Sequence, residues 1–282
     1  MSKNEMINFY EHKDVKKLMP KYRNPHFEQT QMQIPARIGV IAPSGTGKTQ
    51  WLLNYINKCQ DTFGHIIVVY KATEPLYEFL RDKVGSKNIT FYTKLTELPS
   101  PVDLNMGNKQ ILLVFDDQVA EKNQAKIEEY YIRGRKIGAG ITMAYLSQSF
   151  FAIPTLIRRQ FNYVIILKLS GKRDLNLILS NYALWIEVDQ IMKLYKNATK
   201  DKFNFLRIDI DNLFPNSKTD MPPSMPKRVN LKGLTHFGTD RGSHLLRLVN
   251  LRRFIYPHLH AHAQLRHPRR QNILGYRYRF VT

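Results

Sequence analysis

The sequence predicts an α/β fold: a mostly parallel central sheet flanked by helices and followed by a basic C-terminal tail. From Ala36 onward, short β-branched runs alternate with longer amphipathic stretches, as strands and crossover helices do around a parallel sheet. Most of the short runs are apolar throughout, which is typical of strands covered on both faces. The hydrophobic share of 43% and the aromatic share of 11% are those of a globular protein and argue against wholesale disorder.

The elements follow in order along the chain. The β-branched runs predict strands over 37–42, 65–70, 90–93, 110–115, 141–146, 163–169 and 203–210. The amphipathic stretches between them predict helices over 48–58, 74–84, 121–135, 154–160, 172–182 and 189–195. Pro75 and Pro154 lie where a first helical turn tolerates a missing amide donor.

Four segments are predicted from this pattern. Residues 1–34 are polar and have little periodicity, so we expect an N-terminal arm. Residues 35–212 form the α/β domain, and the proline-rich stretch 213–226 is a linker. Residues 227–282 hold twelve Lys or Arg and one acid, Asp240, and their irregular pattern assigns no fold to this basic tail.

The charge predicts a polyanionic partner. With 43 Lys and Arg against 23 Asp and Glu, the net charge is +20 at pH 7, which favours nucleic acid. The single cysteine, Cys59, excludes an internal disulfide and a cysteine-built zinc site. Neither a signal peptide nor eighteen uncharged apolar residues in succession occur in the sequence, so we expect a soluble intracellular protein without a membrane partner.

The segment between the first strand and the first long helix predicts a phosphate-binding loop. It consists of Ala42, Pro43, Ser44, Gly45, Thr46, Gly47, Lys48 and Thr49. Small residues let consecutive amides turn inward around phosphate oxygens, while the helix N-terminus faces them. Lys48 is expected to contact the β- and γ-phosphates of ATP, and Thr49 to offer a hydroxyl to Mg²⁺. Ala42 stands where this motif usually has its first glycine.

Two acids follow the strand at 111–115 and predict the hydrolytic half of the site. Because parallel strands end at the same edge of a sheet, Asp116 and Asp117 should lie beside the phosphate loop. We assign Asp116 to the metal and Asp117 to the attacking water, as general base or orienting carboxylate. The alternative for Asp117 is a cap of the following helix.

Gln148 follows another strand, where an amide can sense the γ-phosphate or hold the water. An arginine from a neighbouring subunit often completes such a site. Two clusters could supply it, 133–136 and 158–159, and we prefer Arg135. Basic residues at a helix C-terminus are also ordinary partners of the helix dipole, which leaves the choice open.

Together these residues resemble the FtsK–HerA class of ring-forming DNA-translocating ATPases, and within it the genome-packaging ATPases of large DNA viruses and virophages. The match rests on residues 42–49, 112–117, 133–138, 145–154 and 157–161.

The resemblance covers about residues 34–211 and implies a RecA-like P-loop NTPase fold with an additional strand between the two nucleotide motifs. It also implies a homo-oligomeric ring that pulls double-stranded DNA into a preformed capsid, with a capsid or portal component as partner, at the site of virion assembly inside the host cell.

Two other readings of the sequence stay open. A helicase uses the same motor parts, and DNA-stimulated hydrolysis without unwinding would favour packaging over it. A nucleic-acid-binding structural protein with a vestigial nucleotide site is the second, although Lys48, Thr49, Asp116 and Asp117 occurring together argue against it. A small-molecule kinase would require neither the charge of +20 nor the paired acids.

Overall fold

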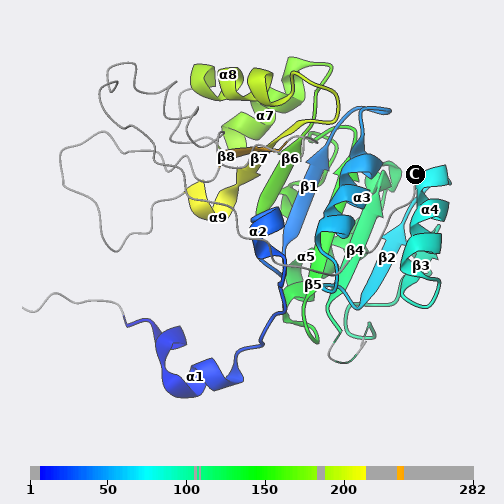
Figure 1. Cartoon of the computed structure of the whole chain (residues 1–282), viewed down its shortest axis with the longest axis vertical. Coiled ribbons are helices and arrows are strands. Elements are labelled where there is room, and N and C mark those ends of the chain that lie inside the picture. Colours follow the sequence, from blue (N-terminus) through cyan, green and yellow to red (C-terminus); the bar gives the residue numbers. More distant parts are fainter. Residues whose placement is uncertain (1–6, 105–106, 108, 183–187, 214–233, 238–282) are drawn as a thin grey trace, which may run out of the picture. The chain divides into compact units, whose positions relative to one another are not determined.

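A central sheet organises the residues that the computed structural model describes, which are 7–104, 107, 109–182, 188–213 and 234–237. Its strands are β1 (Arg37–Ile41), β2 (His65–Val69), β3 (Ile89–Tyr92), β4 (Ile111–Asp116), β5 (Ile141–Ser147), β6 (Tyr163–Ile166), β7 (Phe205–Asp209) and β8 (Leu234–Phe237). Within the described residues they lie in the order β3-β2-β4-β5-β1-β6-β7-β8 (Figure 1). Pairing is parallel from β3 to β6, and β7 and β8 are antiparallel to their neighbours.

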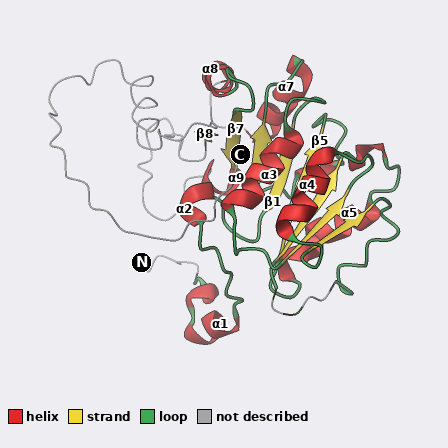
Figure 2. Cartoon of the chain, turned by 45° about the vertical axis from the view of Figure 1, so that its right-hand side comes forward, coloured by secondary structure: helices red, strands yellow, loops and turns green. Residues whose placement is uncertain are grey.

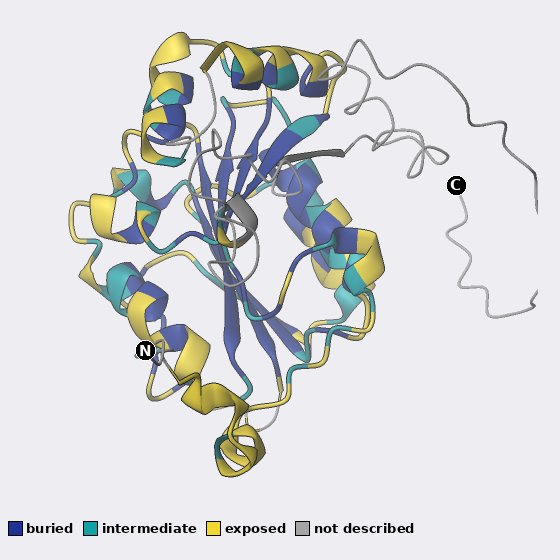
Figure 3. Cartoon of the chain, turned by 90° about the vertical axis from the view of Figure 1, so that its left-hand side faces the viewer, coloured by how far each residue is buried: buried dark blue, intermediate teal, exposed yellow. Residues whose placement is uncertain are grey.

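Helices cover both faces of this sheet (Figure 2). One face carries α3 (Lys48–Lys58) and α4 (Pro75–Val84), and the other carries α5 (Ala125–Arg133), α6 (Thr155–Arg158), α7 (Lys172–Tyr182) and α8 (Val188–Ala198). The strands alternate between the two layers. Leu112 and Val114 pack toward α3, whereas Leu113 and Phe115 pack toward α5. Because both faces are covered, β2, β4, β5 and β6 are buried along their length (Figure 3).

The predicted α/β fold with a mostly parallel sheet is therefore confirmed. Strands occur in all seven predicted runs, and α3 and α7 have their predicted bounds. The helix predicted over 121–135 is shorter, because 3₁₀ turns flank α5 at Gln118–Ala120 and Gly134–Lys136. The helix predicted over 154–160 is limited to α6, and α4 and α8 differ from their predictions by a few residues at their ends.

The segments outside the domain are described only in part. The N-terminal arm contains the short helices α1 (Lys13–Leu18) and α2 (Phe27–Thr30), which the weak periodicity did not predict. The short helix α9 (Ile210–Leu213) follows β7 where the domain was predicted to end. The linker beyond it and the basic tail, apart from β8, lie outside the described residues, so their predicted boundaries stay predictions. Among the described residues, no helix is both long and apolar enough to cross a membrane.

The parallel strands give the sheet two functionally different edges. The carboxyl ends of β1, β4, β5 and β6 meet at one edge, here named the strand-end edge, and their first residues meet at the strand-start edge. Ligands of open α/β sheets bind outside the carboxyl ends of the strands. The loops that follow these strands are consequently where the predicted site residues come together.

Candidate active site

The loop between β1 and α3 makes a tight turn at the strand-end edge. Gly45 has φ 72° and Gly47 has φ 110°, conformations that residues with a side chain rarely adopt. The amide and the hydroxyl of Thr46 both donate to the carbonyl of Pro43, at 3.3 and 2.7 Å. The amides of Ser44, Gly45 and Gly47 donate to no acceptor in the described part of the chain. Free amides beside a helix N-terminus form a site for an anion such as phosphate.

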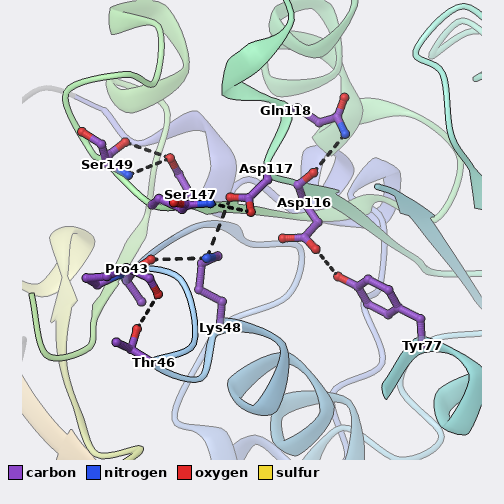
Figure 4. Close-up of polar contacts among 11 residues, drawn as sticks. Pro43, Thr46, Lys48, Tyr77, Asp116, Asp117, Gln118, Ser147 and Ser149 are labelled. Atoms are coloured by element: carbon purple, nitrogen blue, oxygen red, sulfur yellow. Dashed lines mark hydrogen bonds and ion pairs between the residues drawn. The ribbon is translucent and has the colours of Figure 1, made fainter. Parts of the chain in front are cut away.

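Lys48 begins α3 and extends its side chain back across the loop (Figure 4). Its Nζ donates to the carbonyl of Ala42 at 3.3 Å and lies 3.8 Å from Oδ1 of Asp117. Ala42 itself is fully buried, and its amide continues the β1–β5 pairing by donating to Ser147 at 3.0 Å. An ammonium has three N–H groups, so Lys48 has a donor left for a phosphate oxygen beside these two acceptors.

Asp116 ends β4 and is 6% exposed. The hydroxyl of Tyr77, from α4, donates to its Oδ2 at 2.6 Å. Burial raises the pKa of Asp116 to about 6, and the charges of Asp117 and Glu74 act in the same direction. The Tyr77 hydrogen bond and the charge of Lys48 oppose this rise in pKa. The Tyr77 hydrogen bond therefore holds the carboxylate in one orientation and partly offsets the effect of burial on its pKa.

The other oxygen of this carboxylate fits a cation. Asp116 Oδ1 is buried and has no hydrogen-bond partner among the described residues. Burying a carboxylate oxygen in this way destabilises the fold unless a ligand binds to it. Thr49, in the first turn of α3, is also buried. The described residues contain no group of three or more His, Cys, Asp or Glu that could hold a metal ion. Mg²⁺ usually takes one or two protein oxygens and completes its shell with phosphate and water, which suits Thr49 and Asp116.

Asp117 lies just beyond β4 and joins Lys48 to the end of β5. Its backbone is left-handed, with φ 48°, and its amide donates to the carbonyl of Leu146 at 3.0 Å. The side chain of Gln148, which is exposed, donates through Nε2 to Asp117 Oδ2 at 3.1 Å. Although Asp117 is the N-cap residue of the following 3₁₀ turn, its side chain makes no capping hydrogen bond. Its carboxylate is directed to Lys48 and Gln148, so the capping alternative does not hold.

Two supporting residues were missed in the sequence. In the sequence, Tyr77 is only one residue of an amphipathic helix. Its contact with Asp116 depends on β2 lying beside β4, which the sequence pattern does not show. Gln118, fully buried, donates to the carbonyls of Asp116 and Val69 at 3.0 and 3.3 Å and ties these strand ends together. The one feature of the sequence that could have identified Gln118 is its position directly after the two acids.

The loop that carries Gln148 is anchored by an acid from α7. Asp174 Oδ1 accepts from the hydroxyl of Ser149 and from the amide of Phe151, both at 2.9 Å. Ser147 accepts from the amide of Ser149 at 3.2 Å and donates to its carbonyl at 2.8 Å. Because two of these four hydrogen bonds come from α7, the position of Gln148 depends on a tertiary contact as well as on the local ones.

The predicted arginines lie apart from this constellation within one chain. Arg135 is exposed in the 3₁₀ turn before β5, at the strand-start edge, where its carbonyl accepts from Tyr22 at 3.5 Å. Arg158 is half-buried, donates to Thr155 at 2.9 Å and lies 5.2 Å from the centre of the Phe150 ring. In the described part of the chain, neither has a contact with Lys48, Asp116 or Asp117.

The chain matches the model of a known protein family. A family described as Poxvirus A32 protein matches residues 24–222. This range includes the whole phosphate loop, both acids and Gln148. No curated protein sequence matches the chain significantly.

Solved structures with a related fold come from viral and bacterial ATPases. The genome packaging NTPase B204 from Sulfolobus turreted icosahedral virus 2, in complex with ATP-gammaS, is 16% identical, with a TM-score of 0.47 over 64% of this chain and 95% of that chain. The same protein with AMPPCP is 15% identical, with a TM-score of 0.48 over 64% and 95%. EssC from Geobacillus thermodenitrificans is 12% identical, with a TM-score of 0.39 over 52% and 34%. At these values the likeness does not by itself assign an activity.

Proposed function

This chain belongs to the poxvirus A32 protein family, and from that premise we propose that it is an ATP-hydrolysing motor that packages double-stranded viral DNA into a preformed capsid. The observation that carries the proposal is the contact of Lys48 and Gln148 with opposite oxygens of Asp117, directly beside the free amides of the phosphate loop. The reaction is hydrolysis of the bond between the β- and γ-phosphates.

Substrate phosphates enter the loop and accept hydrogen bonds from its amides. The Lys48 ammonium, held 3.8 Å from Asp117, contacts the β- and γ-phosphate oxygens and neutralises charge that develops during transfer. Each Asp117 oxygen keeps a lone pair beside these contacts, so the carboxylate can orient a water molecule and accept its proton as the water oxygen attacks the γ-phosphorus. Gln148 keeps Asp117 in place and senses the γ-phosphate.

Thr49 and Asp116 would hold Mg²⁺. When bound, the ion neutralises charge on the phosphate oxygens and orients them for in-line attack. Tyr77 fixes the Asp116 carboxylate with one oxygen toward α4, which leaves Oδ1 for the ion.

The proposed partners are double-stranded DNA, a capsid or portal component and further copies of this chain in a ring. The net charge of +20 and the twelve Lys or Arg of residues 227–282 support the DNA contact. Such contacts bind phosphates without reading sequence and weaken steeply with salt. The protein acts inside the infected cell, where virions assemble.

Arg135 is proposed to complete the site of a neighbouring subunit, because it is exposed and lies far from the acids of its own chain. Subunits with Arg135→Ala and subunits with Lys48→Ala should each be inactive alone. Mixed rings should regain hydrolysis, because an intact loop can then meet an intact arginine. Arg133→Ala, in the same cluster but paired with Glu129 at 3.1 Å, is the matched control. Full activity of Arg135→Ala alone would remove this residue from the mechanism.

The test of the function is ATP hydrolysis by the full chain with and without double-stranded DNA. Lys48→Ala should abolish turnover, whereas Lys94→Ala, an exposed lysine away from the loop, should not change it. Stimulation by DNA that weakens between about 50 and about 200 mM salt supports the motor. Strand separation would indicate a helicase, and DNA binding without any hydrolysis would indicate a structural protein with a vestigial site.

A further inference from the structure

The strands on the two sides of β1 indicate in which orientation a nucleotide would bind at the strand-end edge. Asp116, Asp117 and Gln148 follow β4 and β5, which lie on one side of β1. Strands β6 and β7 lie on the other side. Because hydrolysis places the γ-phosphate next to the acids, the nucleoside must extend over the loop toward β6 and β7.

Phe203 is the aromatic side chain that meets the loop from that direction. It precedes β7, whose antiparallel pairing of Leu206 with Ile166 brings its first residues to the strand-end edge. A methyl group placed on Gly47 would lie 2.6 Å from Cδ1 and 3.1 Å from Cε1 of the Phe203 ring. The ring therefore touches the last residue of the phosphate loop. It is nevertheless 37% exposed, so part of it remains available to a ligand.

The backbone of Phe203 is strained. Its φ of 65° lies in the left-handed region, which is an outlier for a bulky residue. The other residues with a side chain and positive φ in the described chain are Gln31, Asp61 and Asp117. Asp tolerates this region better than Phe, because its short polar side chain can bond locally. Strain of this kind concentrates at ligand sites, where the surrounding structure holds a side chain in a required position.

A cation accompanies the ring. The Nζ of Lys202 lies 5.0 Å from the centre of the Phe203 ring, and Lys202 is exposed. This side of the loop thus presents a flat apolar surface next to a positive charge. A nucleotide is complementary to this surface, because its flat base can stack on the ring while its negative phosphates lie near the lysine.

We propose that Phe203 is the platform on which the base of the bound nucleoside triphosphate stacks, with Lys202 beside the ribose and α-phosphate. This proposal rests on the proposed ATPase function. The ring supplies stacking affinity, and the loop amides with Lys48 supply the affinity for phosphate. Phe203 is accordingly a specificity residue that distinguishes a nucleotide from a bare polyphosphate.

The two contributions separate when ATP and inorganic tripolyphosphate are titrated against the full chain. Phe203→Leu, which keeps apolar volume but removes the flat face, should weaken ATP binding about tenfold and leave tripolyphosphate binding unchanged. Phe203→Tyr should retain wild-type affinity for both. Phe79→Leu is the matched control, because Phe79 is also exposed and also has a lysine ammonium, that of Lys83, at 5.5 Å from its ring.

Two results would overturn the assignment. One is an unchanged affinity of Phe203→Leu for ATP, and the other is an equal loss for ATP and tripolyphosphate, which would mean that the ring only supports the loop. Wild-type protein that binds neither compound would overturn the assignment together with the ATPase. If ATP binds but is not hydrolysed, the proposed function fails, while the ATP-selective loss in Phe203→Leu still supports the platform.

Discussion

Amides at one edge of the central sheet and carboxylates at the other differ in how completely they are hydrogen-bonded. At the strand-start edge, the Gln110 side chain accepts from the amide of Arg23 and donates to the carbonyls of Arg23 and Thr62, at 2.8 and 2.9 Å. At the strand-end edge, Asp116 Oδ1 and Asp117 Oδ1 are buried without a hydrogen-bond partner among the described residues. The Gln110 amide, which ties the fold together, has its partners, while the two carboxylates at the candidate site each keep an oxygen for a ligand.

A second pair of residues at the strand-start edge follows the same rule. Asn162 Oδ1 accepts from the backbone amide and Nε of Arg37 at 3.2 and 3.3 Å, and its Nδ2 donates to Asp211 at 2.9 Å. Every polar atom of this amide has a partner. Changes at the two edges should therefore have opposite consequences for stability and for activity.

The largest effect is expected at Asp117. Asp117→Asn removes the charge that orients water and accepts its proton, and turnover should fall about a hundredfold or more. Asparagine tolerates a φ of 48°, so the backbone should not change. Steady-state hydrolysis and ATP affinity would be measured together. Loss of affinity without loss of turnover would contradict the role given to this carboxylate.

A substitution of Asp116 should show how much stability the protein loses by burying this ionised carboxylate. Because burial raises its pKa from 3.8 to about 6, the folded state binds a proton more tightly than the unfolded chain does. Its stabilising contribution is fully present below about pH 4 and is lost as the pH rises through about 6, with a total of about 3 kcal/mol. Asp116→Asn keeps the shape but cannot ionise, so it should abolish activity and increase stability above pH 6.

Denaturant unfolding at pH 5 and pH 8, in the presence of a chelator, measures this difference. The gap in unfolding free energy between Asp116→Asn and the wild type should widen at the higher pH. A gap that is the same at both pH values would show that this carboxylate is not costly to bury in its ionised form.

Gln110 should show the reverse behaviour. Gln110→Ala leaves the carbonyls of Arg23 and Thr62 and the amide of Arg23 without their side-chain partner, and should reduce the free energy of unfolding by about 1–3 kcal/mol. Hydrolysis per folded molecule should stay at the wild-type rate, because the residue is at the opposite edge from the loop. Reduced turnover with unchanged unfolding would reverse the distinction between the edges.

The smallest effect is expected at Tyr22. Its hydroxyl donates to the carbonyl of Arg135 at 3.5 Å, and the contact is exposed. Hydrogen bonds of this length are weak, and Tyr22→Phe should change the unfolding free energy by less than about 0.5 kcal/mol. A larger loss would mean that exposed contacts also hold the strand-start edge together.

Local pattern determined most of the fold and the centre of the candidate site. Alternation of apolar runs predicted seven strands and six helices, because periodicity is a property of neighbouring residues. The glycines of the loop at 42–49 and the acids at the end of β4 indicated the nucleotide site for the same reason, since turn chemistry and strand ends are local. The positions of Lys48, Asp116, Asp117 and Gln148 at one edge followed from parallel pairing alone.

Tertiary structure decided what surrounds that centre. Tyr77 reaches Asp116 because β2 lies beside β4, and Phe203 reaches Gly47 because β7 pairs antiparallel with β6. Arg135 lies at the far edge because α5 runs back along the sheet after β4. Strand order depends on which apolar faces, distant in sequence, pack against one another, and no periodicity within a single run contains that information.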